Sequence, residues 1–511
     1  MVATRARRAS GEGTPRAAAP RRVSTRSTSP APKKPAARAR SPARKSSKNL
    51  KAPPAELSPY DMPPLEKFLR CVLLPLFLLV PCPLLVAVLA FATNSDATSP
   101  SIDGLASYIS EHGVGGLLAD SFEYVGIFGT AEAWKLLGYF NLAALILYYV
   151  PGETKEGPRT ATGHVPRYVD NGVAHCVLSS LLFVGGAYFE YYDAGILYDV
   201  FPGTIGALNA FGLVFCVFLY VKGLYAPSTA DNGKSGGGLI FDYYWGTELY
   251  PRVFDIDIKK FVNCRFAMTY WQLAGLSFAY KSYTLHGRWD PGLVLAALSQ
   301  YLYLVKFFAW EIGYMRSIDI IVDRAGFYET WGCLVWVPCV YTLHSRCGVR
   351  APTGLSWLSA GIIFVVGLLG VGLNFWADAQ RMRFRELNGK CKVWGRKPVY
   401  IKAKYVTADP ATGTLTEHSS LLLASGWWGV ARHLQYSFEL TAAWSWGLLA
   451  NPVENGPLPL FYAAFLTILL VHRAHRDEEK CLKKYGAYYE DYMARVKYRI
   501  VPGVYLSLIH I

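Results

Sequence analysis

LLLASGWWGVARHLQY, residues 421–436, sets the first expectation for this chain. An apolar run passes directly into two adjacent tryptophans, glycines and an arginine–histidine pair. A guanidinium and an imidazole cost free energy at a membrane boundary, so such groups usually have a function there. The stretch is neither a plain membrane span nor an ordinary soluble loop, and it marks a candidate site.

The composition around this stretch is that of a polytopic membrane protein. The 511 residues are 52% hydrophobic, 14% aromatic and only 17% charged. A bilayer core needs about 20 apolar residues per helix. We therefore predict an all-α fold of about ten transmembrane helices with a cytosolic C-terminal cofactor-binding region. The spans are expected near residues 72–93, 134–150, 172–190, 204–224, 267–283, 292–312, 327–343, 354–376, 436–450 and 458–471.

The basic charge is concentrated at the N-terminus. Residues 1–60 hold 15 Lys and Arg side chains but only two acids, so they carry most of the formal charge of +15. Such a segment has too little apolar surface to offset the entropy of ordering. We predict a disordered cytosolic tail that touches anionic lipid. A chromatin-binding tail and an organelle transit peptide are the alternatives.

Charge asymmetry orients the predicted spans. With a cytosolic N-terminus, the stretch 381–404 follows the eighth span and faces the cytosol, and it holds nine Lys and Arg side chains against the single acid Glu386. This agrees with the positive-inside rule and places both termini in the cytosol. The ten cysteines form no CxxC pair, so we expect reduced, packed thiols and no metal site.

Three polar segments of the last third, 381–398, 421–436 and 472–503, supply the groups that a dinucleotide requires. Their Arg and Lys side chains suit phosphates and their aromatic rings suit stacking, in a chain without a Rossmann glycine motif or P-loop. Arg381 and Arg385 are spaced to share one helix face. The alternatives are a patch that binds lipid headgroups and, for the third segment, a solvated amphipathic helix.

Several acids are candidates for proton chemistry. Glu311, in KFFAWEIGY, follows an apolar run, and Asp319 and Asp323 lie just beyond it. An acid at such a depth is expensive unless it is paired or used. Glu311 is therefore either paired with Lys306 or Arg316, or it orients or protonates a substrate.

Longer motifs carry a resemblance to a known family. They are FDYYWGTELYPRVFDIDIKKFVNCRF (241–266), DRAGFYETWGCLVWVPCVYT (323–342), NGKCKVWGRKP (388–398), the SGWWG and RH pattern of 425–433, and KYRIVPG (497–503). From about Pro63 to Tyr505 the chain resembles the sterol reductases that saturate Δ14, Δ24(28) or Δ7 double bonds, and most closely the plant-type Δ7 (7-dehydrocholesterol) branch. The resemblance implies a sterol-binding part (61–380), an NADPH-binding part (381–505) and extra residues 506–511.

The resemblance also implies an activity, namely NADPH-dependent reduction of the C7–C8 double bond of the sterol B ring in sterol biosynthesis. Δ14 and Δ24(28) reduction are the alternatives. The cofactor contacts carried over are Arg381, Arg385, Leu423, Trp428, Gln435, Tyr436, Asp477, Cys481, Leu482, Lys483, Lys484, Tyr485 and Tyr492. The chain departs from the family where relatives often have Lys at position 381 and Asn at position 435.

An isolated alkene is a poor hydride acceptor, so the reaction needs a proton donor beside the nicotinamide. We draw the donor from a pool in which Glu311 is favoured: Glu311, Tyr314, Asp319, Asp323 and Tyr436. The expected partners are a sterol in the bilayer, membrane lipid and other enzymes of sterol biosynthesis, but not nucleic acid.

The expected location is the endoplasmic reticulum membrane, with the nuclear envelope or a plastid membrane as alternatives. Two rival functions remain at the level of sequence. One is an isoprenylcysteine-type methyltransferase. The other is a nuclear-envelope anchor that resembles the lamin B receptor.

Overall fold

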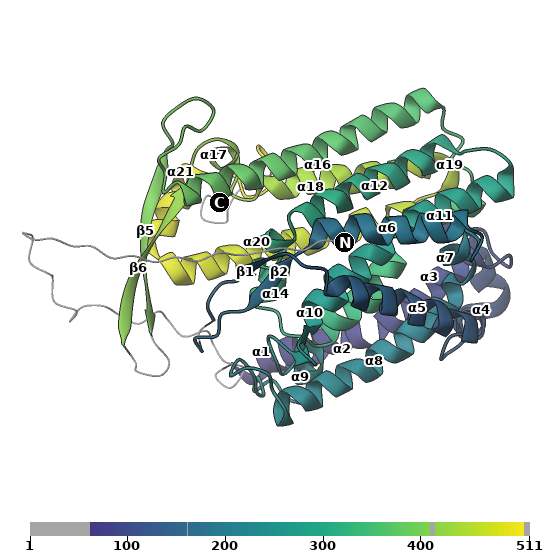
Figure 1. The fold of residues 1–511 in the computed structure, drawn as a ribbon, viewed down its shortest axis with the longest axis horizontal. Coiled ribbons are helices and arrows are strands. Elements are labelled where there is room, and N and C mark those ends of the chain that lie inside the picture. The colour runs from purple at the N-terminus through teal and green to yellow at the C-terminus, as the bar shows by residue number, and fades with distance from the viewer. Residues whose placement is uncertain (1–61, 161, 409–413, 505–511) are drawn as a thin grey trace, which may run out of the picture. The chain divides into compact units, whose positions relative to one another are not determined.

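The computed structural model describes residues 62–160, 162–408 and 414–504 (Figure 1). The predicted tail 1–60 and the extra residues 506–511 lie outside the described residues. The first half of the described chain contains α1 (Pro64–Phe68), η2 (Leu69–Leu73), α2 (Leu74–Leu79), α3 (Pro81–Asn94), α4 (Ile102–Val125), α5 (Ala131–Tyr148), α6 (Gly172–Tyr188), α7 (Ile196–Asp199), α8 (Phe201–Tyr225), α9 (Leu239–Trp245), α10 (Ile258–Lys260), η3 (Phe261–Ala267) and α11 (Met268–His286).

The second half is also mainly helical. It contains α12 (Pro291–Ala309), α13 (Glu311–Tyr314), α14 (Ile318–Ile321), η4 (Phe327–Tyr341), α15 (Leu343–Arg350), α16 (Trp357–Glu386), α17 (Trp427–Val430), α18 (Leu434–Leu449), α19 (Pro452–Asn455), η5 (Leu458–Leu460), α20 (Phe461–Tyr485) and α21 (Ala487–Arg495). The chain is thus mostly helical, as predicted.

Apolar helices coincide with the predicted spans. A helix occupies each of the ten predicted stretches. Within the described residues, five helical segments are long and apolar enough to cross a membrane, namely Pro64–Asn94, Phe201–Tyr225, Pro291–Ala309, Trp357–Glu386 and Leu458–Tyr485. The count of ten crossings therefore stays a prediction.

Helix α4 was not predicted. It carries polar and charged side chains among its apolar ones and bends at Gly113, whose φ is +72°. A search for uninterrupted apolar runs passes over such a helix. Helices α16 and α20 continue past the predicted spans into the basic segments, so Arg381 and Arg385 lie on one helix as expected.

Three two-stranded antiparallel ladders interrupt the helices. They are β1 (Glu153–Glu156) with β2 (Arg167–Asp170), β3 (Arg252–Val253) with β4 (Ile256–Asp257), and β5 (Tyr400–Ala408) with β6 (Leu415–Leu423). In the longest ladder Tyr400 pairs with Leu423 and Ala408 with Leu415. The apolar run Leu421–Leu423 is therefore the end of a strand, which delivers the chain to the two tryptophans.

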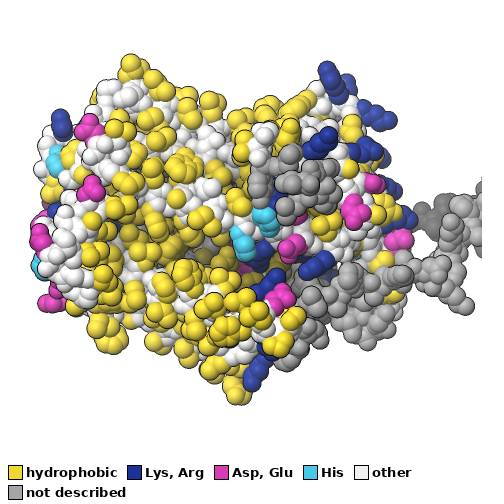
Figure 2. All heavy atoms as spheres, turned by 180° about the vertical axis from the view of Figure 1, so that it is seen from behind, with side chains coloured by type: hydrophobic (Ala, Val, Ile, Leu, Met, Phe, Trp, Pro, Cys, Tyr) yellow, Lys and Arg dark blue, Asp and Glu magenta, His cyan; other side chains and the backbone are white. Residues whose placement is uncertain are grey.

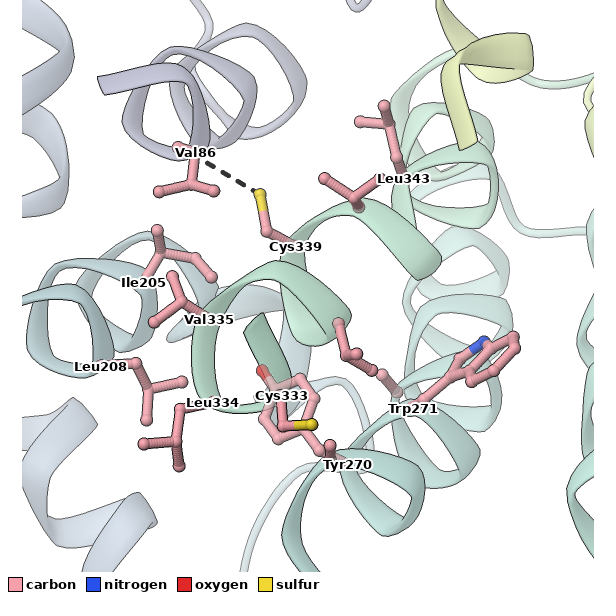
Figure 3. Close-up of a cluster of buried hydrophobic side chains, with 14 of the residues drawn as sticks. Val86, Ile205, Leu208, Tyr270, Trp271, Cys333, Leu334, Val335, Cys339 and Leu343 are labelled. Atoms are coloured by element: carbon pink, nitrogen blue, oxygen red, sulfur yellow. Dashed lines mark hydrogen bonds between the residues drawn. The ribbon is translucent and has the colours of Figure 1, made fainter. Parts of the chain in front are cut away.

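The core forms around η4, whose turns are mostly of the wide π type. Pro338 lies inside this helix and has no N–H to donate, which favours a widened turn. Figure 3 shows Leu334, Val335 and Cys339 of η4 among buried side chains of α3, α8 and α11. The thiol of Cys339 donates to the carbonyl oxygen of Val86, with 3.6 Å between sulfur and oxygen.

Helices α16, α18 and α20 carry the C-terminal part of the chain, and α18 packs against both of the others (Figure 1). The close approach of α16 to α18 depends on Gly370, where an added Cβ atom would lie 2.8 Å from the carbonyl oxygen of Phe438. Apolar side chains cover much of the face shown in Figure 2, whereas Lys and Arg gather towards one end of it. This distribution suits a protein embedded in lipid.

Two of the four glycines of α16, Gly370 and Gly372, give a matched test of this packing. Gly370→Ala should destabilise the fold by about 1–3 kcal/mol, because the new methyl group overlaps the backbone of α18. Gly372→Ala should be neutral or stabilising by up to about 1 kcal/mol, because no atom lies within 4 Å of its added Cβ and alanine favours the helix. Thermal unfolding of the detergent-solubilised chain measures both effects, and equal shifts would contradict the packing argument.

Candidate functional site

Trp428 joins the last turns of α16 to the segment after β6. Its indole Nε1 donates to the carbonyl oxygen of Ala377 at 2.8 Å, and the guanidinium of Arg381 lies 3.9 Å from its ring centroid. Gly426 makes this approach possible, because its φ is +64° and an added Cβ would lie 2.2 Å from Gln380 Oε1. The glycine of SGWWG is thus required by a tight contact with α16.

Helices α20 and α21 bring the C-terminal tyrosines to the same place. The hydroxyl of Tyr492 donates to the carbonyl oxygen of Trp428 at 3.3 Å. Tyr489 and Tyr492 form a buried cluster with Leu422, against which Cys481, Leu482 and Tyr485 pack. Leu423 and Trp428 belong to a neighbouring cluster with Phe384 of α16. Segments far apart in the sequence therefore meet around Trp428.

A buried ionic cluster holds this arrangement together. Arg432 Nε donates to Glu478 Oε1 at 2.7 Å, and Arg499 contacts Glu478 Oε2 at 2.7 Å. Arg432 also donates to the carbonyl oxygens of Val496 and Lys497. One carboxylate of α20 therefore fixes both the start of α18 and the segment 496–500.

Several buried polar atoms in and beside this cluster have no hydrogen-bond partner among the described residues. They include Nε2 of His433, Oε1 of Gln435, Nη2 of Arg432 and Nε1 of Trp427. The nearest acid oxygens of Asp477 and Glu478 lie 4.0 Å from His433 Nε2, and the imidazole stacks on Tyr436 with 5.4 Å between ring centroids. Each unpartnered buried polar atom costs about 1–3 kcal/mol, so such atoms point to a missing ligand or water.

The imidazole of His433 is held neutral. Burial and then the nearby guanidinium groups, that of Arg432 first, lower its pKa to about 3. A neutral imidazole offers one donor and one acceptor. His433 can therefore form a hydrogen bond with a ligand without bringing a further positive charge into a site that already contains several arginines.

The structure thus brings together most of the residues that sequence reasoning assigned to a cofactor: Arg381, Arg385, Leu423, Trp428, Gln435, Tyr436, Asp477, Cys481, Leu482, Tyr485 and Tyr492 lie on elements that meet here. Two lysines do not point to this centre. Lys483 lines a separate shallow cleft of about 220 Å³ with Trp245 and Arg476. Lys484 lies over the ring of Tyr405, at 4.2 Å from its centroid.

The acids Asp319 and Asp323 are bound to α20. Arg473 contacts Asp319 at 2.7 Å, and Arg476 contacts Asp323 at 2.7 Å. Asp323 is buried, and its backbone carbonyl also accepts a hydrogen bond from Lys259. These ion pairs fasten α20 to the segment that precedes η4.

Glu311 lies in a different ionic cluster. The prediction that it pairs with Lys306 or Arg316 is wrong. Its carboxylate contacts Arg265 through both oxygens, at 2.9 Å for one of them, and Lys260 lies 3.5 Å away. Burial opposes ionisation of Glu311, but the charge of Arg265 prevails and lowers its pKa. A carboxylate held in this way is a poor proton donor at neutral pH.

Sequence reasoning missed a second polar pair inside the apolar helices. The hydroxyl of Tyr303 on α12 donates to Glu439 Oε1 on α18 at 2.6 Å. The ring of Tyr303 lies against Trp271 and Trp446, with centroid distances of 5.6 and 5.3 Å. A single acid within the predicted span 436–450 was the signal that could have revealed this pair.

The neutral state of His433 predicts how stability depends on pH. The folded-state pKa lies below the unfolded value of about 6.5, so the unfolded chain binds more protons between those two values. The stabilising contribution is fully present above about pH 6.5 and is lost as the pH falls.

The slope of the free energy of unfolding against pH reports how many more protons the unfolded chain binds than the folded one. Replacement of His433 by Gln should lower that number by about one between pH 5 and 6.5. An unchanged slope in the His433→Gln protein would show that His433 is not held neutral.

Comparison with known proteins identifies the family of the chain. The family model described as "Ergosterol biosynthesis ERG4/ERG24 family" matches residues 109–505. Relatives include 7-dehydrocholesterol reductases of Arabidopsis thaliana (43% identical, covering 74% of this chain and 86% of the relative) and Xenopus laevis (35%, 73% and 78%). A Delta(14)-sterol reductase of Methylotuvimicrobium alcaliphilum is 34% identical, covering 74% of this chain and 83% of the relative. The chain belongs to the ERG4/ERG24 family of sterol reductases.

Proposed function

We propose that this protein reduces the C7–C8 double bond of a sterol B ring with NADPH. The similarity to 7-dehydrocholesterol reductases over about three quarters of the chain supports the substrate class. The observation that carries the proposal is the pair of unpartnered buried atoms, His433 Nε2 and Gln435 Oε1, beside Tyr436. Buried atoms of this kind are available for hydrogen bonds to a bound ligand.

The residues around Trp428 fit a nicotinamide dinucleotide. Arg381 and Arg385 lie one helical turn apart on α16 and provide positive charge for phosphates. His433 and Gln435 provide a donor and an acceptor for a carboxamide group. NADPH, when bound, supplies the hydride. The protein orients this cofactor and excludes water from the reacting atoms.

The surface between η4 and α20 fits the sterol. Tyr328, Trp336 and Tyr341 of η4 are only partly buried, as is Phe465 of α20. The rings of Trp336 and Phe465 lie 5.2 Å apart. Rigid aromatic side chains of this kind suit a flat, apolar ligand that enters from the bilayer.

The Tyr303–Glu439 pair is the best-placed proton source. Tyr303 contacts the aromatic cluster that reaches η4 through Tyr341 and Trp271. The hydroxyl of Tyr303 can give its proton to one alkene carbon, and the other carbon then accepts the hydride. Tyr303 regains a proton from water before the next turnover, and Glu439 orients its hydroxyl. Tyr436 remains the second candidate from the predicted pool.

A Δ14-sterol reductase is the second candidate function, because a relative with that name is 34% identical. We also propose ten membrane crossings in the endoplasmic reticulum, with both termini in the cytosol, since the basic stretch 381–404 then faces the cytosol. The proposed partners are the bilayer sterol and other enzymes of sterol biosynthesis.

Purified full-length protein should oxidise NADPH and remove the conjugated-diene absorbance of 7-dehydrocholesterol, with the product identified by mass spectrometry. Arg385→Ala should raise the KM for NADPH by about 10–100-fold, because a charge-assisted contact with a phosphate is lost. Arg383, two residues away and therefore on another face of α16, gives the control. Arg383→Ala should leave the KM nearly unchanged. Reduction that proceeds without NADPH, or an unchanged diene, would contradict the proposed function.

Three further variants separate the proton donors. Tyr303→Phe should lower kcat by about 10²–10⁴-fold with little change in the KM for NADPH, because general acid catalysis is lost. Tyr436→Phe tests the second candidate in the same assay. Glu311→Gln should retain NADPH binding and turnover wherever the chain still folds, since the ion pair of Glu311 is structural. Normal kcat in Tyr303→Phe would remove Tyr303 from consideration.

A further inference from the structure

His344 is a buried histidine without hydrogen bonds to the rest of the described chain. It lies in the first turn of α15, immediately after η4, and is 1% exposed. Neither Nδ1 nor Nε2 has a partner among the described residues. An imidazole offers a hydrogen bond at each nitrogen, and each unmet bond costs about 1–3 kcal/mol. An ionisable side chain that deep in an apolar body calls for a functional explanation.

The polar groups around His344 are already bonded to one another. Gln300 receives a hydrogen bond from Trp271 Nε1 at 2.7 Å and donates to Ser345 Oγ at 2.9 Å. Trp446 Nε1 donates to Ser299 Oγ at 2.9 Å. The aromatic wall beside the imidazole, formed by the rings of Trp271, Tyr303, Trp446 and Tyr462, thus has acceptors for both of its indole donors. His344 alone presents two nitrogens without a hydrogen bond there.

The same wall connects His344 to the proposed reaction centre. The imidazole lies nearly parallel to the indole of Trp446, with 6.2 Å between centroids, and Tyr303 contacts that indole at 5.3 Å. Tyr462 lies 5.8 Å from His344 and 4.6 Å from Tyr341. Tyr303 and Tyr341 are only partly buried, so the cluster is open on their side.

The groups around His344 favour one class of ligand. Such a ligand has a rigid, flat, apolar body that lies against the aromatic rings and one small polar group that reaches the imidazole. A hydroxyl group can donate to one imidazole nitrogen or accept from the other, so it serves either tautomer. A sterol carries one hydroxyl at the end of a fused apolar ring system. This reasoning rests on the proposed function, which supplies the sterol.

We infer that His344 binds the ring hydroxyl of the sterol substrate. The imidazole and the ring of Tyr303 both lie against the indole of Trp446, so a hydroxyl held at His344 sets how far the ring system advances along the aromatic wall. His344 thereby places the B-ring double bond beside Tyr303 and selects for 3-hydroxysterols.

The test compares 7-dehydrocholesterol with its 3-deoxy analogue, cholesta-5,7-diene. Binding to the full-length protein is measured from the ligand-induced shift in thermal unfolding, and turnover is measured from diene loss with NADPH. The wild type should prefer the hydroxylated diene by about tenfold or more, because a site built for a hydroxyl rejects an analogue that lacks it. His344→Phe should reduce this preference to about twofold or less, with the KM for NADPH unchanged.

Stability provides an independent readout. Without ligand, His344→Phe should unfold at the same or a higher temperature than the wild type, since it removes two unpaired buried polar atoms. His344→Gln retains a donor and an acceptor and should keep part of the preference. Ser345→Ala is the matched control, because it breaks the neighbouring hydrogen bond from Gln300 and should keep the full preference.

Two outcomes would overturn the inference. One is an undiminished preference for the hydroxylated diene in His344→Phe, which would assign the nitrogens to buried water. The other is a large loss of stability in both His344 variants, which would make His344 a structural residue. If the wild type binds both dienes but reduces neither, the proposed reaction fails. The binding comparison still decides the role of His344 in that case.

Discussion

The arrangement of the C-terminal half depends on one buried carboxylate. Glu478 accepts from Arg432 at the start of α18 and from Arg499 near the end of the described chain. Removal of one partner from a buried ion pair typically costs about 3–5 kcal/mol, because a charge is left without compensation. Near this carboxylate, the segment 496–500 lies along the stretch of chain that contains His433 and Gln435. The candidate cofactor site therefore has no separate domain of its own, and it forms where three distant segments meet.

The structure uses its buried charges in two different ways. Glu311 with Arg265 and Asp323 with Arg476 are ion pairs that fasten elements together. In these pairs a guanidinium compensates the charge of the carboxylate. Neither nitrogen of His344 has a hydrogen bond within the described chain, and Nε2 of His433 has none either. An opposing charge therefore distinguishes the structural pairs, although Arg265 Nε and Asp323 Oδ2 also have no hydrogen-bond partner among the described residues.

Much of the fold could be predicted from the sequence, because long apolar runs identify helices directly. Helix α4 and the β5–β6 ladder could not, since the former mixes charged residues with apolar ones and the latter depends on pairing between strands. The candidate site could be predicted only in part. The motif around Trp428 indicated where the candidate cofactor residues lie. The ion-pair partner of Glu311 could not be predicted, because Arg265 is 46 residues away in the sequence and only tertiary packing brings it close.

The position of residues 496–500 has a consequence for biosynthesis. Their backbone carbonyls receive hydrogen bonds from Arg432, His433 and Ser437, so the start of α18 is not fully bonded until this stretch has arrived. During translation those residues are made after all the long apolar helices of the described chain. A nascent chain can therefore contain these helices before residues 496–500 exist to complete the hydrogen bonds at the start of α18.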